Sequence, residues 1–182
     1  MATPVGTTYA LFKKALIETL QSDSNLVNVA VNYSAPVQAV DITGDTGLFE
    51  AIYFMDPDTN NMRLSAIEGD QSNVIICSTP LQIDEVYEVP LAIAVMMPEE
   101  ETQDVVDIRA DELLYRVMKA IASNPGMGVK DPANHPEVVH CYATQGEFAK
   151  QAGLISDDGA GRGSGWSLRI KVKARLQYAT VA

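Results

Sequence analysis

The sequence predicts an α+β fold, in which a mostly antiparallel β-sheet has two main helices packed chiefly on one of its faces. Two segments repeat apolar residues at the spacing of an amphipathic helix, and several others alternate apolar and polar residues as half-buried strands do. With 182 residues, 47% of them hydrophobic, the chain has the length and apolar content of one domain. Neither a repeat nor a break in composition divides it, so residues 1–182 are expected to form a single domain.

The two helices are predicted at residues 8–21 and 102–123. Thr7 or Thr8 is in position to cap the first helix, whose apolar stripe is formed by Tyr9, Phe12, Leu16 and Leu20. Asn124-Pro125-Gly126 ends the second helix, whose stripe is formed by Val106, Ala110, Leu113, Val117 and Ile121. A stripe of this length must pack on a large apolar surface, and the sheet is the only predicted element that offers one.

Four strands are predicted with clear patterns, at residues 26–33, 83–97, 137–148 and 166–178. In the last of them, apolar residues share one face and polar or basic residues share the other, which is typical of an antiparallel sheet with one solvated side. In the strand at 83–97, Pro90 lacks the amide hydrogen that a ladder uses, and it therefore predicts an edge or a bulge.

Residues 34–82 are expected to consist of strands joined by long loops. The strand candidates are residues 48–55, which are aromatic and β-branched, and the apolar residues 74–77. The sequence Asp56-Pro57-Asp58 is expected to be a turn. A further loop is expected at residues 156–165, where repeated glycines predict a mobile hairpin connection.

The formal net charge of −11 excludes a general nucleic-acid-binding role, because the neutralisation of phosphates needs clustered Lys and Arg. Between Lys14 and Arg109 the chain holds 17 acidic residues and one basic residue, Arg63. Four basic residues then share the polar face of the last strand: Arg169, Lys171, Lys173 and Arg175. These four are either a solvated surface or a subunit interface that meets the acidic surface of the next copy.

The acidic residues before the second helix form a second candidate surface. Three glutamates precede the helix and an aspartate lies in its first turn, where acids complement the helix dipole. These residues, the candidates for an acidic channel or a partner surface, are Glu99, Glu100, Glu101 and Asp104.

No set of residues predicts catalysis, a cofactor or a metal site, so the chain is expected not to be an enzyme. His140 and Cys141 are neighbours on a strand and therefore point to opposite faces. The sequence from Asp56 begins like a calcium loop but lacks the required Gly and Glu. A small-ligand-binding or hydrolytic domain with a pocket near Cys77 or His140 stays open as an alternative.

The two cysteines are expected to be reduced and buried, with a Cys77–Cys141 disulfide as the less favoured alternative. No signal peptide is predicted at the N-terminus. The longest apolar stretch, at residues 89–97, is too short to span a bilayer. These features predict a protein of the cytoplasm that does not contact a membrane.

The order of these elements resembles that of the tail terminator proteins of long-tailed bacteriophages. The segments that carry the resemblance are TYALFKKALIETL, VNVAVNY, EVYEVPLAIAVMM, DVVDIRADELLYRVMKAIASNP and GWSLRIKVKARL. It implies a homo-oligomer, a hexameric ring that caps the tail tube, binds the tail-tube protein and the head connector, and lets DNA through without specific binding. It also implies a virion protein of the tail or neck that assembles in the host cytoplasm. Another neck protein and a tube-forming relative are the alternatives within this class.

Overall fold

The computed structural model describes residues 6–34, 49–55, 81–98, 101–131, 133–152 and 161–178. Two α-helices, one short 3-10 helix and five strands lie in these ranges. In chain order they are α1 (Tyr9–Gln21), η1 (Ser24–Leu26), β1 (Ala30–Asn32), β2 (Phe49–Phe54), β3 (Leu81–Pro98), α2 (Gln103–Ser123), β4 (Val138–Ala152) and β5 (Gly161–Tyr178).

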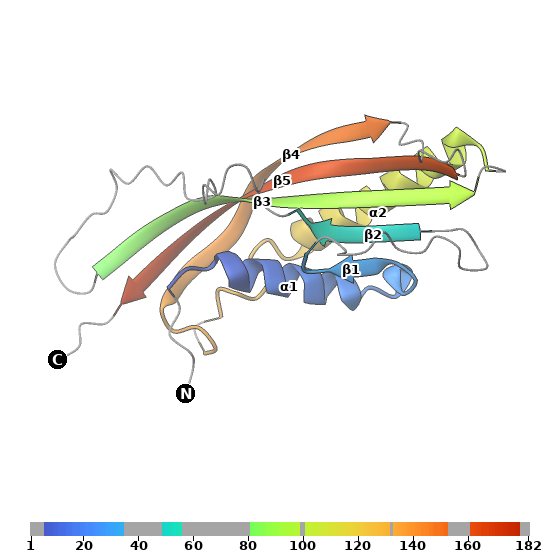
Figure 1. Ribbon diagram of the computed structural model, residues 1–182. Coiled ribbons are helices and arrows are strands. Elements are labelled where there is room, and N and C mark those ends of the chain that lie inside the picture. The colour runs from blue at the N-terminus through green and yellow to red at the C-terminus, as the bar shows by residue number, and fades with distance from the viewer. Residues whose placement is uncertain are drawn as a thin grey trace.

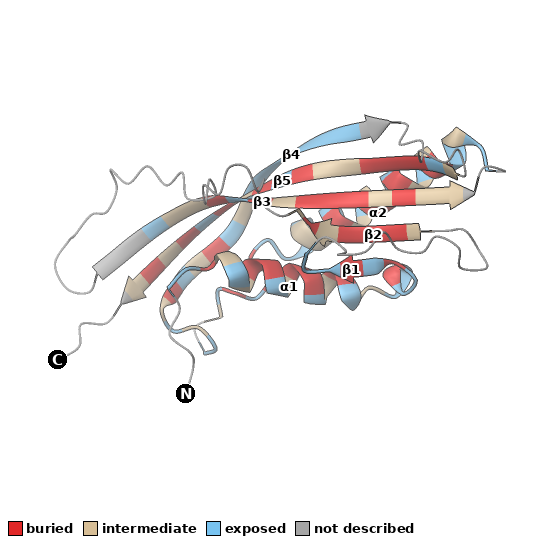
Figure 2. Cartoon of the chain, viewed as in Figure 1, coloured by how far each residue is buried: buried red, intermediate tan, exposed pale blue. Residues whose placement is uncertain are grey.

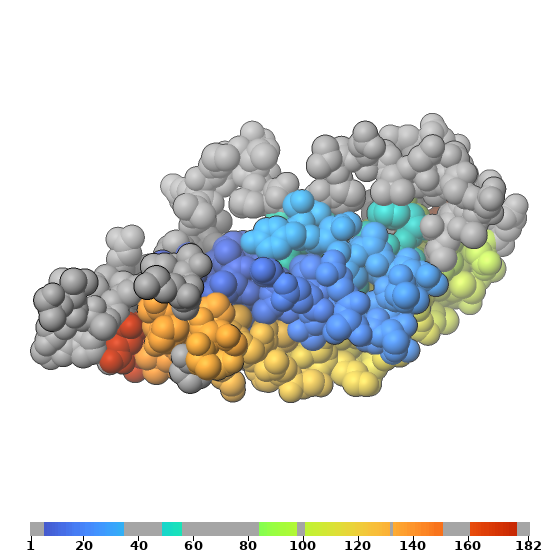
Figure 3. All heavy atoms as spheres, turned by 90° about the horizontal axis from the view of Figure 1, so that it is seen from below, coloured from blue at the N-terminus to red at the C-terminus, as the bar shows by residue number. Residues whose placement is uncertain are grey.

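The five strands form one sheet in the order β1-β2-β3-β5-β4 (Figure 1). β1 runs parallel to β2, and the other three pairings are antiparallel. Both helices pack on the same face of the sheet, where their buried residues join those of β3 and β5 in one apolar cluster. Figure 3 shows this side of the molecule, with α1 in blue beside α2 in yellow. The predicted α+β class is confirmed.

Helix α1 packs on the sheet through the stripe that the sequence predicts. Its fully buried members are Phe12, Leu16 and Leu20. Thr8 precedes the helix, but its side chain makes no capping hydrogen bond. Its hydroxyl instead donates to the Glu85 carboxylate at 2.9 Å and lies 2.8 Å from the Tyr87 hydroxyl. Thr8 therefore ties the start of α1 to β3.

The prediction of a strand at residues 26–33 is wrong over most of that range. The described chain forms the 3-10 helix η1 first, and β1 contains three residues. Val27 is 79% exposed and does not share a buried face with Val31. The reason is local, since the Asp23 carboxylate accepts a hydrogen bond from the Asn25 amide at 2.9 Å. Such a side-chain bond stabilises a turn in competition with a strand.

In the region expected to hold loops and strands, β2 lies within the predicted strand at 48–55. The expected turn at 56–58 and the expected strand at 74–77 lie outside the described residues. The long strand predicted at 83–97 is confirmed as β3 and begins two residues earlier. β3 is central in the sheet, with β2 on one side and β5 on the other.

Pro90 lies where the neighbours of β3 change. From Leu91 onward β3 pairs with both β2 and β5, whereas before Pro90 it pairs with β5 alone within the described ranges. The Pro90 carbonyl accepts a hydrogen bond from the Met55 amide at 3.2 Å, so the backbone of Pro90 faces the end of β2. The missing amide hydrogen therefore interrupts no bond to β5. Among the described strands, the edge that proline predicts is the first half of β3.

Helix α2 covers β3 and β5, and it buries the predicted stripe. Its fully buried members are Val106, Ala110, Leu113 and Val117, whereas Ile121 is half-buried. A charged contact adds to this packing, because the Arg109 guanidinium binds both carboxylate oxygens of Glu50 in β2, at 2.5 and 2.8 Å. Glu50 is buried, so the paired geometry satisfies a carboxylate that would otherwise be costly to bury.

The glycines expected in a mobile loop at 156–165 belong in part to β5. Residues 153–160 lie outside the described chain, but β5 begins at Gly161, five residues before its predicted start. A Cβ at Gly161 would lie 2.8 Å from the Met97 carbonyl oxygen, and one at Gly165 would collide with the Ile93 carbonyl oxygen. The close approach of β3 thus requires these two glycines, so the loop prediction is wrong for residues 161–165.

Candidate functional site

The face of the sheet opposite the helices carries the basic residues of β5. Alternate residues of β5 point to opposite faces, and Ile170 and Val172 are buried beneath the helices. The residues between them point to the open face, as the sequence predicts. We call these four residues the basic column: Arg169, Lys171, Lys173 and Arg175.

The two ends of the basic column have acidic neighbours on β3. Arg175 lies opposite Asp84, and its guanidinium binds both carboxylate oxygens at 2.5 and 2.7 Å. This contact holds the pKa of the Asp84 carboxyl below its usual value and raises that of Arg175. At the other end, Arg169 lies 4.0 Å from a Glu88 carboxylate oxygen. Both pairs are solvent-exposed, so they contribute little to stability.

The two lysines in the middle of the basic column differ in their neighbours on β3, because Lys171 lies opposite Glu88 and Lys173 lies opposite Val86. Lys171 and Lys173 form no ion pair within the part of the chain that the structure describes. On the β4 side they lie opposite Gln145 and Tyr142, neither of which is a carboxylate. Because alternate residues of a strand are only about 7 Å apart, the two ammonium groups repel each other. The middle of the column is therefore a positively charged surface that Glu88, which also lies near Arg169, compensates only in part.

His140 borders the column without adding to its charge. It lies opposite Arg175 on β4, and its ring is 5.5 Å from that of Tyr142. Partial burial, together with the Arg175 guanidinium, lowers the pKa of His140 below its usual 6.5. The imidazole is therefore neutral at pH 7.

The acidic candidates lie at a different place from the basic column. Glu101 and Asp104 are exposed at the start of α2, and Glu99 and Glu100 lie outside the described residues. Arg169 pairs with Pro90, eight residues before the end of β3, and eight residues of a strand span about 26 Å. Within one chain the structure does not bring the two charged surfaces together.

Asp104 also has a local structural role in the first turn of α2. The Thr102 hydroxyl, followed by the amides of the first turn, holds the pKa of the Asp104 carboxyl below its usual value. The charge of Asp104 is therefore matched to the positive end of the helix dipole.

The cysteine and histidine considered as catalytic candidates are separated by the sheet. Cys141 is buried on the helix side as a free thiol, with its sulfur 3.9 Å from the Tyr87 hydroxyl. Burial raises the pKa of both Cys141 and Tyr87, so both stay protonated at neutral pH. His140 faces the other side, as predicted, and Cys77 lies outside the described residues. The described residues contain no group of three His, Cys, Asp or Glu that would hold a metal ion.

The pattern of the sequence does not identify the acidic partners of the basic column. Asp84 and Glu88 belong to the acidic part of the chain and are four residues apart on one strand. Even-numbered positions of β3 face away from its buried residues, as do the odd-numbered positions of β5. That alternation places both acids on the open face, but their pairing depends on the register of β3 against β5.

Comparison with models of known protein families and with curated proteins finds no match to this chain. None of the helices in the described ranges combines the length and the apolar character that a membrane span requires.

Proposed function

We propose that the protein is a structural subunit of a bacteriophage tail. In this proposal six copies form a ring that caps the tail tube, binds the tail-tube protein on one side and joins the head connector on the other. The ring belongs to the neck of the virion and assembles in the host cytoplasm. It lets DNA through and performs no chemical step.

The observation that carries the proposal is the positive charge of Lys171 and Lys173 on the open face, where neither forms an ion pair within the described residues and Glu88 is the one acid opposite them on β3. A charge pair that is absent within one chain is available between two chains, because acidic residues greatly outnumber basic ones in the rest of the sequence. Since the two charged surfaces lie far apart on one subunit, a contact between them is head-to-tail. Head-to-tail contacts generate closed rings when the rotation between subunits closes.

The net charge supports the expected relation to DNA. A ring of subunits that each carry a charge of −11 repels a polyanion, so DNA in the channel does not adhere to it. The basic column is consistent with this role only if it faces the neighbouring subunit and not the channel. In the proposed ring the acidic residues at the start of α2, Glu101 and Asp104 among them, lie opposite the column of the next copy.

The test is the mass and shape of the purified protein, measured by size-exclusion chromatography with light scattering and by negative-stain electron microscopy. The proposal predicts closed rings with about six times the subunit mass of 19.7 kDa. Open-ended tubes would instead indicate a tube-forming protein. A stable monomer at all concentrations and salt conditions would contradict assembly and favour a domain that acts alone.

A further inference from the structure

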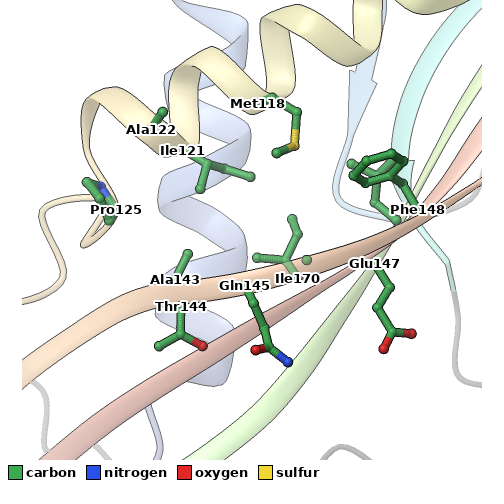
Figure 4. A pocket seen from close by; sticks show the side chains of 12 residues that line it. Met118, Ile121, Ala122, Pro125, Ala143, Thr144, Gln145, Glu147, Phe148 and Ile170 are labelled. Atoms are coloured by element: carbon green, nitrogen blue, oxygen red, sulfur yellow. The ribbon is translucent and has the colours of Figure 1, made fainter.

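The far edge of the sheet, formed by β4, borders an apolar groove on the helix side. The groove has a volume of about 220 Å³ and lies between the second half of α2 and β4. Figure 4 shows Met118 and Ile121 of α2 pointing toward Ile170 across it, with Pro125 at one end and Phe148 at the other. Phe148 is 57% exposed although its ring packs edge-on against Trp166. An exposed aromatic at the mouth of an apolar groove marks a binding surface.

The backbone beside this groove has hydrogen-bonding groups that pair with none of the described residues. β4 is the last strand of the sheet in the described chain, and Figure 2 shows it exposed over much of its length. The Ala143 amide points away from β5, because it donates to the Pro125 carbonyl at 2.8 Å. After the bulge that follows Ala143, alternation along the strand directs the amides and carbonyls of Gly146, Phe148 and Lys150 outward. None of the described residues pairs with this stretch of the edge.

The edge and the groove together define the side chains of a strand that would add there. In such an added strand, the residues opposite Gly146 and Phe148 point to the helix side and enter the groove, so they must be apolar. The residues between them point to the open face, beside Gln145 and Glu147. Glu147 is exposed and the chain as a whole is strongly acidic, so basic side chains are favoured at these positions.

Neither β3 nor β1 of a second copy of this chain fits the edge well. The other long free edge within the described residues is the first half of β3, whose open-face side chains include Asp84 and Glu88. Pairing this edge with β4 would place these acids beside Glu147, which is unfavourable. β1, at the opposite end of the sheet, offers only three residues.

We infer that the β4 edge from Gly146 to Lys150, with the adjoining groove, binds an extended segment of a partner protein in which apolar and basic residues alternate. The segment adds as a sixth strand, its backbone bonded to β4 and its apolar side chains in the groove. Main-chain bonds then supply affinity, and the groove and Glu147 supply specificity. This inference does not depend on ring formation, because its main-chain bonds lie at the β4 edge and its apolar contacts lie on the helix side, away from the basic column.

The probe is a synthetic heptapeptide with the sequence of residues 169–175, Arg-Ile-Lys-Val-Lys-Ala-Arg. It has the required alternation, and as part of β5 this sequence already pairs with the inner edge of β4. Isothermal titration calorimetry with the full chain should give saturable one-to-one binding. The same peptide N-methylated at its three apolar residues keeps its side chains but loses the amides that face β4, and it should not bind.

Two substitutions at one position separate main-chain pairing from side-chain effects. Gly146→Pro removes an outward amide, which an edge strand tolerates, whereas Gly146→Ala keeps it. A Cβ at this position meets its nearest neighbour, the Arg169 carbonyl oxygen, at an ordinary 3.5 Å. We expect Gly146→Pro to weaken peptide binding about tenfold or more and Gly146→Ala to leave it nearly unchanged. Glu147→Lys should weaken binding of the basic peptide and favour its charge-reversed analogue, with Glu at the four basic positions.

Several results would overturn the inference. The inference is wrong if the natural chain shows no saturable binding at about 1 mM peptide. Such a result means that the binding free energy is weaker than about 4 kcal/mol. Equal binding of the N-methylated peptide would show that charge alone attracts the peptide. This comparison tests main-chain pairing even if Gly146→Pro fails to fold. A loss of oligomer mass in folded Gly146→Pro would show that the occupant of the edge is a second copy.

Discussion

The two faces of β5 differ in what surrounds them, although they alternate along one strand. On the helix side, Leu168, Ile170 and Val172 lie in the same apolar core as the buried residues of both helices and of the neighbouring strands. On the open side, Lys171 and Lys173 form no ion pair within the described chain, although Lys171 lies opposite Glu88. The comparison indicates that one face of β5 stabilises the fold while the other is available to a partner. Substitutions on the two faces should therefore affect different measurements.

The largest expected effect comes from the helix side. Leu168→Ala removes a side chain that is 2% exposed, and we expect it to lower the free energy of unfolding by ~2–5 kcal/mol through lost burial and a cavity. Urea denaturation followed by circular dichroism measures this. Lys171→Ala on the same strand is the matched control and should change stability by no more than about 0.5 kcal/mol. Similar losses of unfolding free energy in the two variants would mean that both faces of β5 stabilise the fold.

A second expected effect contrasts buried charge with charge on the open face. Glu50→Gln leaves the Arg109 guanidinium with a weaker neutral acceptor, and we expect a loss of about 1–3 kcal/mol of unfolding free energy. The equivalent change on the open face, Asp84→Asn, should cost less than about 1 kcal/mol, because its pair with Arg175 is exposed. Urea denaturation of both variants makes the comparison. A larger loss for Asp84→Asn would show that the open face is covered and structural.

A smaller effect concerns the pKa of His140, at the border of the open face. Partial burial and Arg175 keep this pKa below 6.5, so Arg175→Gln should move it upward, toward 6.5. In the protein without substitutions, His140 is protonated at a higher pH in the unfolded state than in the folded state. The contribution of His140 to stability is therefore fully present above pH 6.5 and is lost as the pH falls through the lower, folded-state pKa. NMR titration of the imidazole measures the shift, and a downward move in Arg175→Gln would contradict this electrostatic interpretation.

The smallest expected effect concerns the Asp84 carboxyl itself. Its pKa is held below 3.8 by Arg175, so the pair persists at neutral pH and breaks only as the pH falls through that lower value. In Arg175→Gln the pKa of Asp84 should rise toward 3.8, as measured by carboxyl NMR. No change would show that the two side chains do not meet in solution.

Regular patterns in the sequence predicted the parts of the fold that depend on one face being buried. The stripe through Leu113 in α2 and the alternation through Ile170 in β5 are of this kind, and both were identified correctly. The two segments predicted wrongly, residues 26–33 and 161–165, have structures that depend on a local hydrogen bond or on a neighbour distant in the sequence. Asp23 turns the chain before β1, and Gly165 is required by the approach of a carbonyl from β3. No periodicity reports either contact.

The candidate site was predicted in part for the same reason. The alternation of β5 places Lys171 and Lys173 on one face, and the structure shows them there. The partners of the outer two bases depend on strand register, which the sequence does not determine for strands separated by a long helix. The groove beside Phe148 was not predicted, because it depends on how the second half of α2 packs against β4, which no pattern in either segment determines.

The central claim is that the open face of β5 mediates assembly and does not stabilise the subunit. The most direct test is the mass of Lys171→Glu combined with Lys173→Glu, measured by light scattering beside its urea denaturation curve. A matched control, Lys119→Glu with Lys130→Glu, makes the same change in net charge at exposed lysines away from this face. The account predicts that the first variant folds with unchanged stability but does not form rings, while the control forms rings normally. Rings of unchanged mass in the first variant at low and moderate salt would contradict it.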